Sequence, residues 1–122
     1  MAGTPEAKVK AALKARLEQL GVLNTNQALQ EITQAADVML TGWYYMPSTN
    51  GYGEAGVWDF VGCYRTKFFA IETKAGKNKL SAHQQIKGKI FEAVGALRYV
   101  VSSVEEANNF SFKHSEIYQS ER

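Results

Sequence analysis

The sequence predicts a mixed α/β domain with the element order α-α-β-β-β-α-β-α. Three observations carry this prediction. Apolar residues recur at helical spacing in the first third of the chain, short aromatic and β-branched runs follow, and a helical segment separates the last two of these runs. With 122 residues, 45% of them hydrophobic and 21% charged, the chain has the size and composition of one globular domain. We therefore expect a single domain over residues 1–112 and a polar tail over residues 113–122.

Two helices are expected in the first third. Thr4 can cap the first helix, Pro5 suits its first position, Glu6 complements its dipole, and Gly21 ends it. Its apolar positions have helical spacing: Val9, Leu13, Leu17 and Leu20. A second helix is expected over residues 24–39, with an apolar stripe made of Ala28, Leu29, Ile32, Ala35, Ala36 and Met39.

The middle of the chain predicts strands over residues 41–46, 57–63 and 68–74. A glycine-rich loop, residues 47–56, separates the first two strands, and a short polar turn separates the last two. If the turn consists of Arg65 and Thr66, a hairpin forms whose register places Val61 opposite Ala70 and Asp59 opposite Glu72. The first three strands can then pair as a meander.

The last third predicts a basic loop over residues 75–80, then a helix capped by Ser81 that runs to about Val94 and is terminated by Gly95. The run over residues 97–102 is expected to be a strand parallel to one already in the sheet. Ser103 begins a short final helix.

Composition and charge bound the class of protein. No run approaches the roughly 18 apolar residues of a membrane span, and no secretory signal is visible. The lone Cys63 excludes an internal disulfide and fits a reducing, cytoplasmic location, where we expect it to be a small core residue. Residues 65–98 hold eight lysines and arginines against two glutamates, which fits a polyanion-facing surface and a solvated basic surface equally well.

Two acids and a lysine interrupt the apolar strands. Side-chain alternation places Asp59 on the face of Val61, and the hairpin register places Glu72 and Lys74 on that same face. Opposed carboxylates repel each other, so such a pair needs a divalent cation, a shared proton or a nearby lysine. Oxygen ligands of this kind suit Mg²⁺. A solvent-exposed ion pair at a strand end is the alternative.

Several segments together resemble the VRR-NUC nucleases, the virus-type replication–repair branch of the PD-(D/E)XK superfamily. The resemblance runs from about Trp43 to Ala107 and rests on Gly56-Val57-Trp58-Asp59-Phe60, Phe69-Ala70-Ile71-Glu72-Thr73-Lys74-Ala75-Gly76, Leu80-Ser81-Ala82-His83-Gln84, Gly95 and Tyr99-Val100-Val101. It implies a restriction-endonuclease-like mixed β-sheet flanked by helices. It also implies a divalent-metal-dependent DNA endonuclease, similar to small phage members that cleave branched DNA such as Holliday junctions as homodimers. A phage protein of this kind would work in the cytoplasm of the bacterial host.

The resemblance also assigns roles to residues. Asp59, Glu72 and the backbone carbonyl of Thr73 would hold Mg²⁺ or Mn²⁺, and Lys74 would orient or help to deprotonate the attacking water. Gln84 would support the site, and Glu6 occupies the place of the family's first-helix acid. Trp58 stands where the family often has proline.

Other interpretations of these residues stay open at this stage. Glu6 can simply favour the helix dipole, and Gln84 can be an ordinary polar residue of a first helical turn. His83 suits an exposed first-turn position better than a catalytic base. Four lysines could follow a DNA backbone: Lys77, Lys79, Lys87 and Lys89. Three tyrosines beside the glycine-rich loop could stack on unpaired bases, although packing suits them better: Tyr44, Tyr45 and Tyr52.

The functional alternatives are a non-catalytic DNA-junction-binding module on the same fold and, less favoured, a nuclease acting on RNA or single strands.

Overall fold

The computed structural model describes residues 3–35, 37–48 and 53–113 of the chain. Its nine elements are, in order, α1 (Pro5–Gln19), β1 (Val22–Leu23), α2 (Thr25–Gln34), β2 (Gly42–Tyr45), β3 (Phe60–Tyr64), β4 (Lys67–Thr73), α3 (Ala82–Ala93), β5 (Leu97–Val101) and α4 (Val104–Asn108). Apart from the short β1, this is the predicted order. The polar tail predicted beyond Lys113 lies outside the described residues.

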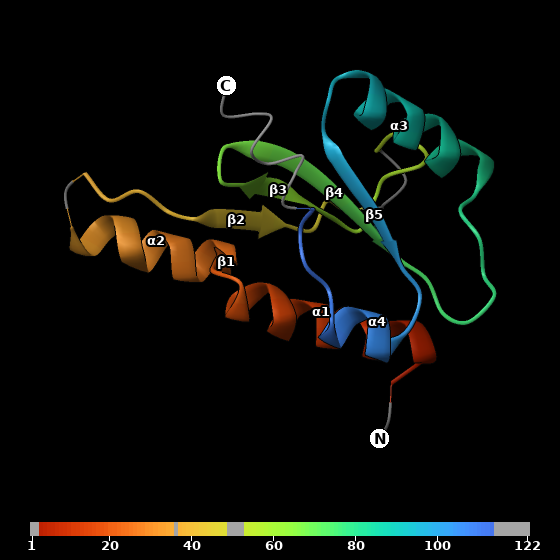
Figure 1. The fold of residues 1–122 in the computed structure, drawn as a ribbon, viewed down its shortest axis with the longest axis horizontal. Helices are drawn as coiled ribbons and strands as arrows, with labels where there is room; N and C mark the ends of the chain where they lie inside the picture. Colours follow the sequence, from red (N-terminus) through yellow and green to blue (C-terminus); the bar gives the residue numbers. More distant parts are fainter. Residues whose placement is uncertain (1–2, 36, 49–52, 114–122) are drawn as a thin grey trace.

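The five strands form one mixed sheet in the order β1-β2-β3-β4-β5 (Figure 1). The two pairs at the edges, β1 with β2 and β4 with β5, are parallel, whereas β2-β3 and β3-β4 are antiparallel. The expected crossover through α3 is confirmed, because β5 lies parallel to β4. The predicted mixed β-sheet flanked by helices is therefore confirmed.

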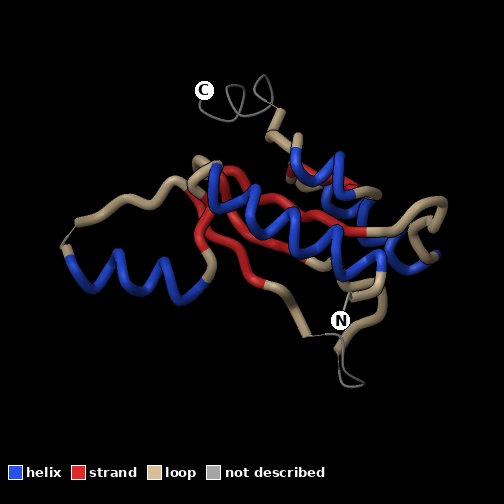
Figure 2. The backbone as a smooth tube through the Cα atoms, turned by 90° about the horizontal axis from the view of Figure 1, so that it is seen from below, coloured by secondary structure: helices blue, strands red, loops and turns tan. Residues whose placement is uncertain are grey.

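Helices cover the two faces of this sheet unequally (Figures 1 and 2). On one face, α1 and α4 close the main hydrophobic cluster, in which Leu13, Leu17 and Ala107 pack with Phe60, Phe69 and Ile71. On the other face, α3 covers a smaller cluster of Trp58, Val61 and Ala70, with Leu80 and Phe91 packed against it. The larger cluster fixes α1 against the centre of the sheet.

The β3-β4 hairpin has the predicted register. Val61 pairs with Ala70 and Cys63 with Phe68, so the turn is the two-residue loop Arg65-Thr66. Both turn residues have positive φ, 49° and 71°, as a type I′ hairpin turn requires. The strand begins only at Phe60, however, so the expected strand start at Val57 is wrong. This matters for Asp59, which lies just before the regular alternation begins.

The second helix is shorter than its sequence pattern indicates. It ends at Gln34, because Ala35 already has extended backbone angles. Only Ala28 of the expected stripe is buried in α2, while Leu29 and Ile32 are about half exposed and Met39, beyond the helix, is exposed. The helix packs against the β1-β2 edge of the sheet, and no further described element covers it (Figure 2). A periodic apolar pattern therefore overstated both its length and its burial.

Two smaller features of the structure differ from the sequence analysis. The strand β1 was not predicted, because two residues are too few to show alternation. Cys63 is exposed rather than buried in the core, since α3 leaves this end of its sheet face open. The neighbouring Phe68 is 40% exposed for the same reason. Within the described part of the chain, no helix combines the length and the apolar character that crossing a bilayer demands.

Candidate active site

The hairpin brings the two predicted acids together at the end of the sheet. Asp59 directly precedes β3, and Glu72 is the second-last residue of β4. The backbone N–H of Asp59 donates a hydrogen bond to Glu72 Oε1 at 2.9 Å. The backbone pairing of the hairpin ends at Phe60 and Ile71. At the next position, the Glu72 side chain accepts the bond from Asp59, which holds the Glu72 carboxylate beside the Asp59 backbone.

The Asp59 carboxylate is oriented by Thr73. Its Oδ2 accepts hydrogen bonds from the Thr73 N–H at 2.9 Å and from the Thr73 hydroxyl at 2.5 Å. Because β3 has not yet begun at Asp59, alternation does not dictate its direction. The carboxylate instead reaches Thr73. Thr73 lies two residues after the core residue Ile71 in β4 and so shares its face of the sheet. The expectation that Asp59 shares the Val61 face is therefore wrong.

Glu72 is the most buried charged group of the site. Its side chain is 4% exposed, and Oε2 lies 3.3 Å from Lys74 Nζ, in an ion pair. The same oxygen accepts a 2.7 Å hydrogen bond from Gln84 Nε2. The structure thus brings Glu72, Lys74 and Gln84 into contact.

Gln84 joins the site to the start of α3. Its side-chain Oε1 accepts a hydrogen bond from the Ser81 backbone N–H, and the Gln84 backbone N–H donates to Ser81 Oγ. This reciprocal pair is a capping box. The cap therefore holds the amide with its NH₂ group directed at Glu72. Gln84 is therefore a polar residue of a first helical turn that also contacts Glu72.

The segment before Asp59 is held against α3 by two close contacts. Trp58 is 1% exposed and donates a 3.0 Å hydrogen bond from Nε1 to the Gln84 carbonyl. Gly56 has φ of +79°, and a Cβ there would lie 2.5 Å from the backbone carbonyl of His83. Trp58 thus anchors this segment to the start of α3.

Glu6 reaches the site through a residue that the sequence did not single out. Lys10 Nζ lies 3.4 Å from Glu6 Oε2 and 3.6 Å from Asp59 Oδ1, so its ammonium group sits between the two carboxylates. The only sequence signal was the i, i+4 spacing of Glu6 and Lys10, which is common on helices. Sequence reasoning missed Lys10 because its contact with Asp59 is tertiary.

Other predicted residues lie farther out. Lys77 and Lys79 are exposed in the loop after β4, and Lys89 is exposed on α3, whereas Lys87 forms an ion pair with Glu54. His83 is exposed. Two of the tyrosines are accounted for by packing, since Tyr44 is buried and Tyr45 stacks on Trp43; Tyr52 lies outside the described residues.

Burial raises the pKa of Glu72, and the negative charge of Asp59 raises it further, while Lys74 opposes this shift. In the folded chain Glu72 therefore keeps its proton to a higher pH than in the unfolded chain. Its contribution to stability is complete below the ordinary pKa of 4.5 and is lost as the pH rises through the raised value. A cation that binds the carboxylate would offset this loss.

We accordingly expect the pKa of the Glu72 carboxyl to lie above 4.5 in the presence of EDTA. Carbon-13 NMR of the side-chain carboxyls measures this pKa. Lys74→Met should raise this titration further, because it removes the compensating ammonium, and excess Mg²⁺ should lower it. Glu54 is the internal control, because Lys87 and not Lys74 lowers its pKa, so the Lys74 substitution should leave its titration unchanged. A Glu72 titration at or below 4.5 would contradict the prediction.

The donor set fits a hard divalent cation. Within residues 3–35, 37–48 and 53–113, no group of three or more His, Cys, Asp or Glu side chains is arranged to hold a metal. Two carboxylates, a backbone carbonyl and waters nevertheless suffice for Mg²⁺, which keeps several of its waters. Asp59 and Glu72 supply these carboxylates, and Thr73 lies directly beside Asp59.

Comparison with known proteins agrees with this architecture. No protein-family model matches the sequence, and no curated protein matches it. A solved structure described as a VRR_NUC domain is similar with a TM-score of 0.62 and 23% sequence identity. The match covers 88% of this chain and 94% of that chain. The chain has the fold of a VRR_NUC domain.

Proposed function

We propose that this chain is a divalent-metal-dependent, structure-selective DNA endonuclease of the VRR-NUC type, with Asp59, Glu72 and Lys74 as its catalytic residues. The observation that carries the proposal is the contact set at the end of the hairpin, where Asp59 N–H, Lys74 and Gln84 all meet one buried glutamate. A solvent-exposed ion pair does not explain it, since the side chains of Glu72 and Lys74 are only 4% and 15% exposed. Buried acids with several dedicated partners are typical of functional sites.

Each residue has a distinct task in phosphodiester hydrolysis. Asp59, Glu72 and the Thr73 carbonyl would hold Mg²⁺ or Mn²⁺, which when bound supplies a more acidic water and polarises the phosphate. Thr73 fixes the rotamer of Asp59, and Gln84 fixes that of Glu72. Lys74 Nζ would donate to a non-bridging phosphate oxygen and orient the attacking water. Glu6 reaches this group through Lys10, so its part is positioning rather than direct ligation.

The DNA would be held by charge. Lys77 and Lys79 are exposed directly after the strand that ends beside Lys74, where they can contact the phosphates on one side of the cut. Lys87 and Lys89, which lie on α3, would add further positive charge for the DNA backbone. Such contacts position a backbone without reading bases, which suits selection of a branched structure such as a Holliday junction during phage replication or repair.

A homodimer is part of the proposal, because symmetric cutting of a junction needs two sites. The exposed face of α3 carries Ile86, Ile90 and Val94 at i, i+4 and i+8, with exposures of 56%, 52% and 72%. A second copy packed on this stripe would remove it from water. The molar mass of the chain in solution tests this part.

The proposal is tested by incubating the chain with labelled four-way junction, flap, linear duplex, single-stranded DNA and RNA in Mg²⁺, Mn²⁺ or EDTA. We expect metal-dependent scission that is fastest on the junction. Salt-sensitive binding without scission in any metal would instead identify the non-catalytic junction-binding module. Scission confined to RNA or single strands would overturn the substrate assignment.

A further inference from the structure

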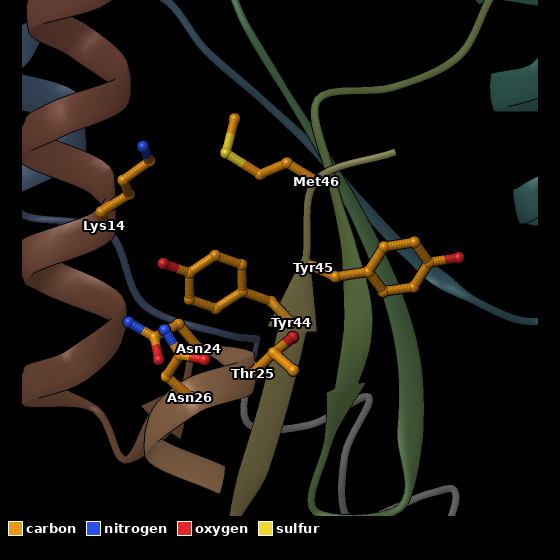
Figure 3. Close-up of a pocket in the computed structure, with 7 residues that line it drawn as sticks. All are labelled: Lys14, Asn24, Thr25, Asn26, Tyr44, Tyr45 and Met46. Carbon is orange, nitrogen blue, oxygen red and sulfur yellow. The ribbon is translucent and has the colours of Figure 1, made fainter. Parts of the chain in front are cut away.

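The pocket shown in Figure 3 lies away from the acidic pair and holds polar groups that the proposed chemistry does not use. It has a volume of about 450 Å³ and lies between α1, the first turn of α2 and the end of β2. Lys14, Asn26 and Tyr44 line it from these three elements. In the described part of the chain, no hydrogen bond or ion pair occupies the side chains of these three residues.

Tyr44 is the informative member, because its ring is buried while its hydroxyl is accessible from the pocket and has no hydrogen-bond partner within the described residues. The residue is 7% exposed and its ring packs against Phe60, yet its hydroxyl points into the pocket (Figure 3). Burial raises the pKa of this hydroxyl, and the charge of Glu18 adds to the effect. The group therefore stays protonated at neutral pH and can donate to an acceptor in the pocket.

The other groups also favour an acceptor. Lys14 brings a full positive charge, and Asn24, Thr25 and Asn26 in the lining stand at the N-terminus of α2, which is the positive end of its dipole. Glu18 lines an adjoining hollow of about 230 Å³ but not this pocket, and its carboxylate accepts a 2.7 Å hydrogen bond from Gln27. The lining thus presents donors and positive charge, and the nearest acid has its own partner.

One helix, α1, carries both a residue that lines the pocket and a residue that contacts the candidate active site. Lys14 follows Lys10 by four residues, which places it about 6 Å farther along the same side of the helix. Lys10 itself lies 3.6 Å from Asp59. A strand whose scissile phosphate lies beside Asp59 would therefore carry a neighbouring phosphate toward Lys14.

We infer that this pocket binds a backbone phosphate of the cleaved DNA strand, beside the scissile phosphate and not at it, through Lys14, Tyr44 and the first turn of α2. The inference rests on the proposed function. It adds a second anchor on the side of α1, opposite to the lysines that follow β4. Two anchors on either side of the cut would fix the path of the strand across Asp59 and Glu72.

The test measures DNA binding in EDTA by fluorescence anisotropy, so that cleavage plays no part. Lys14→Ala is expected to weaken binding of the preferred DNA several-fold and to reduce the slope of log Kd against log salt by about 0.9, the contribution of one phosphate contact. Tyr44→Phe keeps the buried ring and should give a smaller loss. Lys8→Ala is the matched control, an exposed lysine of the same helix that does not line the pocket, and it should leave the slope unchanged.

A second arm locates the phosphate. Neutral methylphosphonates are placed one at a time around the mapped cut site. Wild-type chain should lose affinity at one position close to the cut but not at the scissile phosphate, and the Lys14→Ala variant should not respond there. If Lys14→Ala binds like Lys8→Ala, or responds to every methylphosphonate as wild type does, the phosphate pocket is refuted while the nuclease proposal stands. Wild-type chain that binds no DNA would refute both.

Discussion

Asp59→Asn is expected to reduce metal-dependent DNA cleavage by at least about a hundredfold, while DNA binding in EDTA stays close to that of the wild type. Asparagine keeps an oxygen that can accept the Thr73 N–H, so the local fold is retained. The negative charge that would hold the cation is lost, and with it the activation of the attacking water. The cleavage rate under single-turnover conditions and the affinity for Mn²⁺ by calorimetry both report this change.

Glu31→Gln is the matched control, because it makes the same acid-to-amide change at an exposed position of α2. It should cleave like the wild type. Lys74→Met should also lower cleavage, by about 10²–10³-fold, since it removes a positioned donor to the developing charge. Unlike Asp59→Asn, it should not weaken Mn²⁺ binding, because it removes a positive neighbour of Glu72. Normal cleavage by both variants would mean that the acidic pair is not the catalytic site.

Trp58→Ala is expected to lower the free energy of unfolding by about 3–5 kcal/mol, a large part of the stability of a small domain. Trp58 is 1% exposed, meets Phe91 edge-on at 5.3 Å and donates to the Gln84 carbonyl at 3.0 Å. Its truncation opens a cavity under α3 and leaves that carbonyl without its donor. Chemical denaturation followed by circular dichroism measures the loss without relying on tryptophan fluorescence.

Trp43→Ala is the matched control, since this indole is only partly buried and packs on the exposed Tyr45 at the sheet surface. It should cost clearly less than Trp58→Ala. Equal losses at the two positions would contradict the anchoring role that we assign to Trp58. Trp58→Phe should give an intermediate loss, because it keeps part of the aromatic packing but not the hydrogen bond.

Local patterns predicted most of this fold correctly. Caps at Thr4 and Ser81, the helix terminator Gly95 and the Arg65-Thr66 turn all depend on residues close in sequence, and the structure has each of them. The hairpin register follows from the same short-range logic. The pattern failed where burial depends on a distant partner. Among the described residues, no element beyond β1 and β2 covers the apolar stripe of α2, and Cys63 lies where α3 does not reach.

The candidate site divides in the same way. The sequence by itself determined that Asp59, Glu72 and Lys74 lie near one another, because a two-residue turn fixes the register of two strands. Only the tertiary structure decided that Asp59 reaches Thr73, that Gln84 donates to Glu72, and that Lys10 lies between Glu6 and Asp59. These contacts join segments from three or more elements. Side-chain direction at a strand end and the docking of α1 follow from packing of the whole domain, which no local pattern encodes.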